Sequence, residues 1–207
     1  MKIMVPFADG FEEIEAITNI DVLRRAEINV ITISLEKKIV EGAHNIEFIT
    51  EGNINDVDIT QLEGIVLPGG MPGAVNLRDD KKIIDIVKEL YKNNKLIGAI
   101  CAAPIVLEKA GIINDKKVTS YPGFENKLKS CEYKSDRVVI DGNIITGRGP
   151  GTALEFALSI VRYLKNDKIS EQIRKDMIAN FKIVIFRREE CNLRHTCPIL
   201  SVTRSQL

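Results

Sequence analysis

The chain has 207 residues, with 29 Lys and Arg against 29 Asp and Glu, so its formal net charge is zero. Its 44% hydrophobic and 28% charged residues are typical of one globular domain and exclude a chain that is disordered throughout. Zero net charge argues against nucleic acid or an acidic membrane as the partner, and no apolar run reaches the roughly 18 residues of a spanning helix. The four cysteines are too few for a disulfide scaffold, and the N-terminus is no signal peptide, so we expect a cytoplasmic protein with free thiols.

Strand and helix patterns alternate along residues 1–181. Residues 2–7 predict a buried strand, residues 12–26 a helix, and residues 29–35 a second strand rich in β-branched side chains. The later predicted elements are a small hairpin or arm at 40–50, strands at 64–67 and 95–100, helices at 81–91 and from 102 to 110, a hairpin at 137–146, and helices at 151–164 and 170–181. Apolar strands separated by helices predict an α/β fold whose mostly parallel sheet is covered on both faces.

Cys101 directly follows a predicted buried strand and precedes a predicted helix with Pro104 in its first turn. This order is typical of a nucleophile elbow, a sharp turn that presents a reactive side chain. A thiol there faces the positive end of the helix dipole, which favours the thiolate. A buried structural cysteine explains the pattern equally well, because free cysteine is commonly buried.

A glycine-rich loop, LPGGMPG at residues 67–73, follows another predicted strand. Its glycines leave backbone N–H groups free to face the same end of the sheet. The amides of Gly70 and Ala102 would then form an oxyanion hole beside the Cys101 sulfur. An ordinary strand-to-helix loop would also contain Gly and Pro.

Glu15 falls on one stripe of the first predicted helix with Phe11, Thr18 and Val22. A carboxyl group on that stripe would face inward, and burial would keep it protonated and able to donate a hydrogen bond to a thiolate. A solvated surface glutamate is the simpler interpretation from the pattern alone. Glu12 and Glu13 are explained as first-turn residues that the helix dipole favours.

Four motifs in order, FADGFEEIEA, VLPGGMPGAVNL, LIGAICAAP and ITGRGPGTALEFAL, resemble the ThiJ/PfpI superfamily. The most similar branch is that of the Parkinsonism-associated protein deglycase, often called the DJ-one branch. The resemblance covers residues 1–181 and implies a flavodoxin-like three-layer sandwich, a homodimer, and a glyoxalase or deglycase activity that needs no cofactor or metal. The resemblance implies that Cys101 is the family's reactive cysteine, Glu15 its glutamate partner and Gly70 its glycine amide. Gly69, Ala102, Tyr121 and Arg148 are expected around the substrate.

Tyr121 is a departure from the branch, which has a histidine in this segment. A phenol is a poor general base near neutral pH, since its unperturbed pKa is about 10. This replacement disfavours a Cys–His pair within one subunit and therefore a peptidase or amidase.

His44 lies in the predicted arm, where the branch usually has arginine. In the branch this arm approaches the cysteine of the dimer partner, so His44 is a candidate for a histidine supplied in trans. A solvated loop histidine without a role is the favoured alternative.

Residues 182–207 resemble nothing in the family and carry five basic against two acidic residues. Cys191, His195 and Cys197 offer only three ligands, whereas a structural zinc site needs four, so we predict no metal there. We treat 1–181 as the ThiJ/PfpI-type domain and 182–207 as an atypical tail, in which KIVIF could add an edge strand and the basic remainder is expected to be unstructured. A non-native origin fits this tail as well as a native one.

Two functions of different classes remain. The first is an enzyme that converts methylglyoxal-type aldehydes, or glycated substrates, through a hemithioacetal on Cys101. The second is a redox-sensing stress protein or chaperone, because an accessible thiolate oxidises readily and a Glu15 hydrogen bond would stabilise the sulfinate. Both need Cys101 beside Glu15, so the sequence leaves the choice open.

Overall fold

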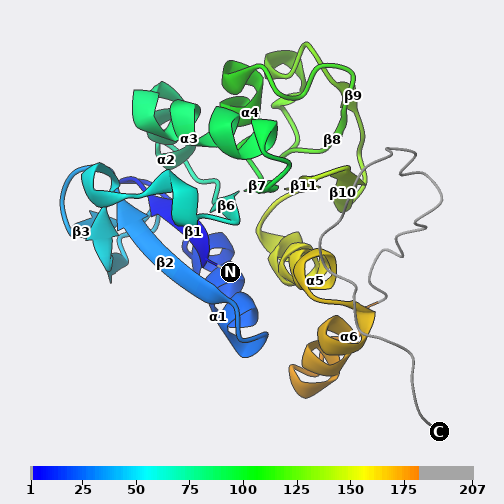
Figure 1. Ribbon diagram of the computed structural model, residues 1–207. Coiled ribbons are helices and arrows are strands. Elements are labelled where there is room, and N and C mark those ends of the chain that lie inside the picture. The colour runs from blue at the N-terminus through cyan, green and yellow to red at the C-terminus, as the bar shows by residue number, and fades with distance from the viewer. Residues whose placement is uncertain (1, 182–207) are drawn as a thin grey trace, which may run out of the picture.

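A computed structural model of the protein describes residues 2–181, and its centre is a seven-stranded sheet (Figure 1). The strand order is β10-β11-β7-β6-β1-β2-β5, and every neighbouring pair is parallel except β10 and β11. The strands are β1 (Lys2–Phe7), β2 (Asn29–Ser34), β5 (Gly52–Asn53), β6 (Gly64–Leu67), β7 (Leu96–Ile100), β10 (Val138–Asp141) and β11 (Ile144–Gly147).

Helices cover both faces of the sheet. One face packs against α1 (Glu13–Arg25) and α5 (Ala153–Leu164), with α6 (Asp167–Asp176) behind α5. The other face packs against α2 (Gly73–Asp79), α3 (Lys81–Lys92) and α4 (Pro104–Ala110). The remaining elements are the two-stranded pairs β3 (Ile39–Glu41) with β4 (Glu47–Ile49) and β8 (Lys117–Val118) with β9 (Glu132–Tyr133), and the 3-10 turns Ile54–Asp56, Ile59–Gln61, Glu125–Lys127 and Pro150–Thr152.

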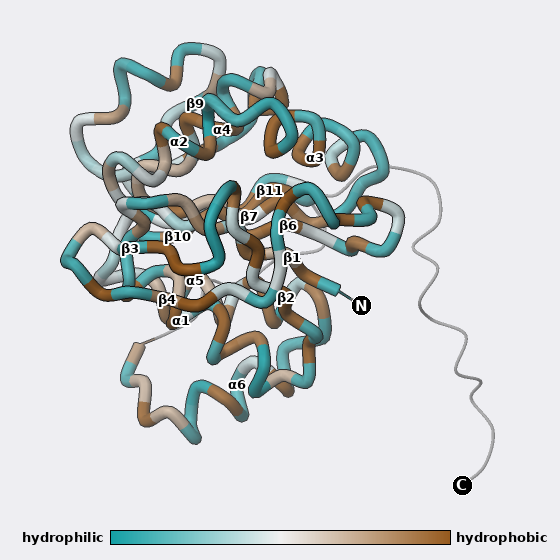
Figure 2. Tube along the Cα trace, turned by 90° about the vertical axis from the view of Figure 1, so that its left-hand side faces the viewer, coloured by the Kyte–Doolittle hydropathy of each residue, from teal (hydrophilic) through white to brown (hydrophobic). Residues whose placement is uncertain are grey.

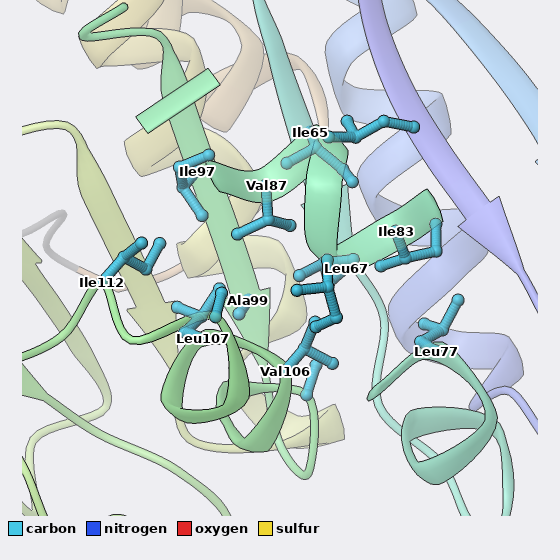
Figure 3. Close-up of a cluster of buried hydrophobic side chains, with 14 of the residues drawn as sticks. Ile65, Leu67, Leu77, Ile83, Val87, Ile97, Ala99, Val106, Leu107 and Ile112 are labelled. Atoms are coloured by element: carbon cyan, nitrogen blue, oxygen red, sulfur yellow. The ribbon is translucent and has the colours of Figure 1, made fainter. Parts of the chain in front are cut away.

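The central strands are apolar along their whole length because both of their faces are buried. In β6, Ile65 and Leu67 pack toward α3 and α4, whereas Val66 packs toward α1 and α5. Figure 3 shows Ile65 and Leu67 meeting the α3 and α4 side chains Val87 and Val106 across this layer. In Figure 2 the hydrophobic segments lie along the strands, and hydrophilic residues alternate with hydrophobic ones along α3.

The predicted α/β sandwich with a mostly parallel sheet is confirmed, and the hairpin turns at Asp141 with Gly142 at a positive φ of 64°. The last predicted helix starts three residues and ends five residues too late, since Asn166 caps the start of α6 by accepting from the Ile169 amide and the helix ends at Asp176. The short elements α2, β5, β8 and β9 were missed. No helix within residues 2–181 is long and apolar enough to cross a membrane. The predictions made for residues 182–207 lie outside the described residues.

Candidate active site

Cys101 occupies a sharp turn between β7 and α4 in the left-handed region of the backbone, with φ at 63°. That conformation is strained for a residue with a side chain and persists only where neighbours hold it. Two backbone hydrogen bonds do so: the Cys101 amide donates to the Gly147 carbonyl, and the Cys101 carbonyl accepts from the Tyr121 amide, both at 2.9 Å. The nucleophile-elbow geometry expected from the sequence is therefore present, with Cys101 8% exposed.

Glu15 is fully buried on α1 and faces the Cys101 thiol, with which it shares a hydrogen bond. Its Oε2 accepts from the Gly69 amide at 2.8 Å. Its Oε1 is buried without a geometrically sound partner among the described residues. A buried carboxylate oxygen that lacks a donor favours the protonated acid. Glu15 therefore points inward, as its helical stripe predicts, and is no surface glutamate.

Gly69 and Gly70 bring the backbone of the loop after β6 against this pair. A Cβ on Gly69 would come within 2.7 Å of both the Cys101 Cβ and Glu15 Oε2. Gly70 has φ at +90°, and its Cβ would lie 2.3 Å from the Gly10 carbonyl oxygen. Only glycine fits both places. The amides of Gly70 and Ala102 consequently both reach the Cys101 sulfur as hydrogen-bond donors.

The protonation of the Glu15–Cys101 pair follows from its burial. Burial raises the pKa of Glu15 to about 7, against the lowering by its hydrogen bonds with Cys101 and the Gly69 amide. Burial also raises the pKa of the Cys101 thiol, as does the negative charge of an ionised Glu15, while the Ala102 and Gly70 amides lower it. A thiolate is therefore favoured only where Glu15 holds the proton.

Burial raises the pKa of the Cys101 thiol and so opposes the stabilisation of the thiolate that is expected from the helix dipole. The helix α4 has only seven residues. The two amides that donate directly to the sulfur are the local stabilisers of negative charge, and they act through hydrogen bonds.

Tyr121 and Arg148 lie on the loops beside the elbow. The Tyr121 ring is half exposed and packs against Gly149, while its amide is bound to the Cys101 carbonyl. Arg148 follows β11 directly, and its Nη1 is buried without a hydrogen-bond partner among the described residues. The pKa of Glu125 is lowered mainly by a hydrogen bond from its own backbone amide, and the positive charge of Arg148 adds a smaller lowering. The predicted substrate-lining residues thus come from strand ends that meet at Cys101.

His44 is exposed and contacts the first turn of α1 in its own chain. Its Nδ1 lies 2.8 Å from Glu13 Oε2 and 3.7 Å from Glu12 Oε2. The hydrogen bond with Glu13 is the largest cause that raises the pKa of His44. Neither contact was predicted, because the two glutamates were explained by the helix dipole alone. The sequence pattern does not distinguish Glu13 from its neighbour Glu12, so it does not predict that Glu13 is the buried partner of His44.

The sequence profile of the DJ-1/PfpI family matches residues 1–163. The chain belongs to this family. Protein dj-1beta of Drosophila melanogaster is 35% identical over 181 residues, which are 86% of this chain and 97% of that protein. The glutathione-independent glyoxalase DJR-1.2 of Caenorhabditis elegans is 36% identical over 177 residues, 84% of this chain and 94% of that protein.

Two plant members of the family and one solved structure are also similar to this chain. Protein DJ-1 homologs B and A of Arabidopsis thaliana are 41% and 40% identical over 162 residues, 77% of this chain, and the match spans only 37% and 41% of their length. The solved structure of oxidized DJ-1 from Toxoplasma gondii has a TM-score of 0.83 and 34% identity, covering 87% of this chain and 99% of that one. The DJ-1 branch and its flavodoxin-like fold, expected from the four motifs, are confirmed.

Proposed function

We propose that the protein is a cysteine-dependent glyoxalase- or deglycase-like enzyme that acts on methylglyoxal-type dicarbonyls without a cofactor. The observation that carries this proposal is the position of Cys101, held in a strained elbow between the buried Glu15 carboxyl and the Gly70 and Ala102 amides. A nucleophile, a proton carrier and two oxyanion donors are the three kinds of group that aldehyde addition and proton transfer require.

The reaction begins when the Cys101 sulfur bonds to the aldehyde carbon, C1, and the carbonyl electrons move onto its oxygen. The Gly70 and Ala102 amides donate to that oxygen as it becomes negative. Glu15, which holds the proton while Cys101 is a thiolate, gives that proton to the C1 oxygen and becomes a carboxylate. The carboxylate then removes the C1 proton and returns it to the neighbouring carbon, C2, while the hydroxyl proton passes from the C1 oxygen to the C2 oxygen. The aldehyde carbon is thereby oxidised and the ketone carbon reduced within one molecule. Water then cleaves the thioester, lactate leaves, and the thiol is restored.

Glu15 suits the role of proton carrier because burial raises its pKa to about 7, so that it both accepts and donates near neutral pH. A single negative charge shared by Glu15 and Cys101 also matches the mechanism, in which thiolate and carboxylate never need to coexist. The half-exposed Tyr121 supplies a hydroxyl beside the elbow, and the buried, unpartnered Nη1 of Arg148 is a further donor for the carbonyl or carboxylate of the substrate.

The named activity of a relative supports the substrate class. The nematode protein at 36% identity is called a glutathione-independent glyoxalase, which is a statement about that protein. Deglycation of proteins or nucleotides is the finer proposal, in which the same thiol adds to the aldehyde-derived carbon of an adduct. The replacement of the branch histidine by Tyr121 leaves the acid–base work to Glu15.

A homodimer is part of this proposal. Five exposed isoleucines lie on the outer side of α1 and on the β3–β4 arm, namely Ile14, Ile17, Ile39, Ile46 and Ile49. The arm is joined to the start of α1 by a β-bridge between Phe11 and Gly42, so the two parts form one surface. An exposed apolar surface of this kind is typical of a protein contact. Two-fold pairing through it would bring each His44 toward the other subunit's site.

Redox sensing by the same thiol is the second candidate function. One solved structural neighbour is described as an oxidized DJ-1, which is a property of that protein. Oxidation of Cys101 to a sulfinate would place negative oxygens against the Glu15 carboxyl and the Gly70 and Ala102 amides. This candidate predicts oxidation of Cys101 without turnover of aldehyde.

Rapid mixing with methylglyoxal followed by acid quench and peptide mapping tests the enzyme proposal. We expect a transient adduct of one methylglyoxal on Cys101 that appears and decays during turnover. Cys131→Ser should leave the adduct unchanged, because Cys131 is the other described cysteine and lies away from Glu15. An absent adduct, or one of equal yield on Cys131, would contradict the proposal.

A further inference from the structure

Glu12, Glu13 and His44 form a cluster of potential metal ligands outside the Cys101 site. One ligand atom from each residue lies within 4.8 Å of the other two. Glu12 is the N-cap residue of α1, Glu13 is the first residue of this helix, and His44 belongs to the loop between β3 and β4. The Cys101 mechanism uses none of these carboxylates.

The backbone orients the Glu13 carboxylate. The His44 amide donates to Glu13 Oε1 at 2.7 Å, which leaves Oε2 facing His44 Nδ1 at 2.8 Å. The chain makes room for this carboxylate with a glycine, since a Cβ on Gly42 would lie 2.2 Å from Glu13 Oε1. Metal ligands in proteins are commonly fixed by such hydrogen bonds to their other atom.

The cluster is also short of positive charge. The side chains of Glu12 and Glu13 are only 12% and 8% exposed, although each is a carboxylate. His44 is their sole ion-pair partner among residues 2–181, and no lysine or arginine there pairs with either. Two neighbouring carboxylates that are largely withdrawn from water need a cation more strongly than one imidazole provides.

The spacing fits one small ion. The Nδ1 atom lies 2.8 Å from Glu13 Oε2 and 3.7 Å from Glu12 Oε2. Tetrahedral zinc with bonds of about 2.0–2.1 Å holds its ligand atoms about 3.3 Å apart, so the observed separations bracket the required one. The carboxylate oxygens of Glu12 and Glu13 lie within 4.8 Å of each other, so side-chain movement of up to about 1.5 Å would complete the geometry.

We propose that Glu12, Glu13 and His44 bind one divalent transition-metal ion, with Zn²⁺ the best fit and a fourth position open to water. The imidazole nitrogen disfavours Ca²⁺ and Mg²⁺, which prefer ligand sets made of oxygen. The ion joins the β3–β4 loop to the start of α1. The bound ion would also occupy the His44 imidazole, so His44 cannot bind the metal and relay a proton to the partner subunit's site at the same time.

Titration of the chelator-treated full chain with Zn²⁺, followed by calorimetry, tests the site. We expect one ion per chain, and at least about a 10-fold loss of affinity in His44→Ala and in Glu13→Gln. Gly42→Ala should weaken binding as well, because the new methyl group displaces the Glu13 carboxylate. Glu47→Gln is the matched control, since it makes the same chemical change on an exposed glutamate of the same arm and should bind as the wild type does.

Co²⁺ spectra distinguish this site from the cysteines. The bound ion should show no sulfur-to-cobalt charge-transfer band, and its binding should persist in Cys101→Ser and in the Cys191→Ser/Cys197→Ser double variant. A charge-transfer band, or Zn²⁺ affinity that is unchanged in both His44→Ala and Glu13→Gln, would overturn the proposal and leave His44 and Glu13 as a hydrogen-bonded pair alone.

Discussion

Replacing Glu15 by Gln should raise the pKa of the Cys101 thiol, because the proposed mechanism has Glu15 protonated and donating to the thiolate. The Glu15 side chain has no exposed surface, and it bonds both the thiol and the Gly69 amide. In the proposed site the protonated Glu15 carboxyl donates an O–H hydrogen bond to the Cys101 thiolate. A hydrogen bond to a charged group contributes about 1.5–3 kcal/mol, which corresponds to about one to two pKa units. Glutamine keeps the size and an acceptor for Gly69 but offers the sulfur only a weaker, neutral N–H donor.

A pH titration of thiolate absorbance in the wild type, Glu15→Gln and Glu15→Asp measures this shift. Cys101 is resolved from the other thiols by performing the titration also in a Cys101→Ser background and taking the difference. Glu15→Asp should shift the pKa in the same direction, because the shorter side chain withdraws the donor by one methylene. The opposite sign would refute the reasoning: a pKa that falls in Glu15→Gln means that the wild type holds an ionised carboxylate beside a neutral thiol.

Three further outcomes follow from the same geometry. Limiting iodoacetamide or peroxide should modify Cys101 faster than Cys131 in mass-spectrometric mapping, since the Gly70 and Ala102 amides both donate to the Cys101 sulfur, whereas the only amide donor to Cys131 is its own; faster labelling of Cys131 would contradict this. Mixing inactive Cys101→Ala with inactive His44→Ala subunits should restore one working site per heterodimer, whereas near-wild-type turnover by His44→Ala alone would end the trans-histidine hypothesis. Gly70→Ala should lower the free energy of unfolding by about 1–3 kcal/mol in denaturant titrations, because it strains a left-handed residue; an unchanged midpoint would show that the loop relaxes freely.

The sheet was predictable because its strands are buried on both faces, which leaves an apolar run in the sequence for each one. β6 and β7 are the clearest cases, and both end at the residues that build the site. The two-residue strands β5 and β8 leave no comparable run, and their pairing depends on neighbours distant in the chain. The start of α6 was missed because one side chain, Asn166, sets it.

The site was predictable in its residues but not in its electrostatics. The strand-to-helix turn predicts Cys101, and the glycine-rich loop after a strand predicts Gly70. The burial of Glu15 could be predicted only with the help of the family motifs. The sign of the Cys101 pKa shift depends on how much water the folded chain removes, which no local pattern contains. The contact of His44 with Glu13 joins an exposed loop to a helix 31 residues earlier, and neither segment predicts the other.

Steady-state lactate formation from methylglyoxal is the decisive test of catalysis by Cys101. The wild type and Cys131→Ser should form many lactate molecules per chain with no added cofactor, and Cys101→Ser should form none above background. Serine keeps the shape of the elbow and removes only the sulfur nucleophile. Equal lactate formation by Cys101→Ser, or consumption of methylglyoxal by the wild type without lactate, would contradict a catalytic role for Cys101.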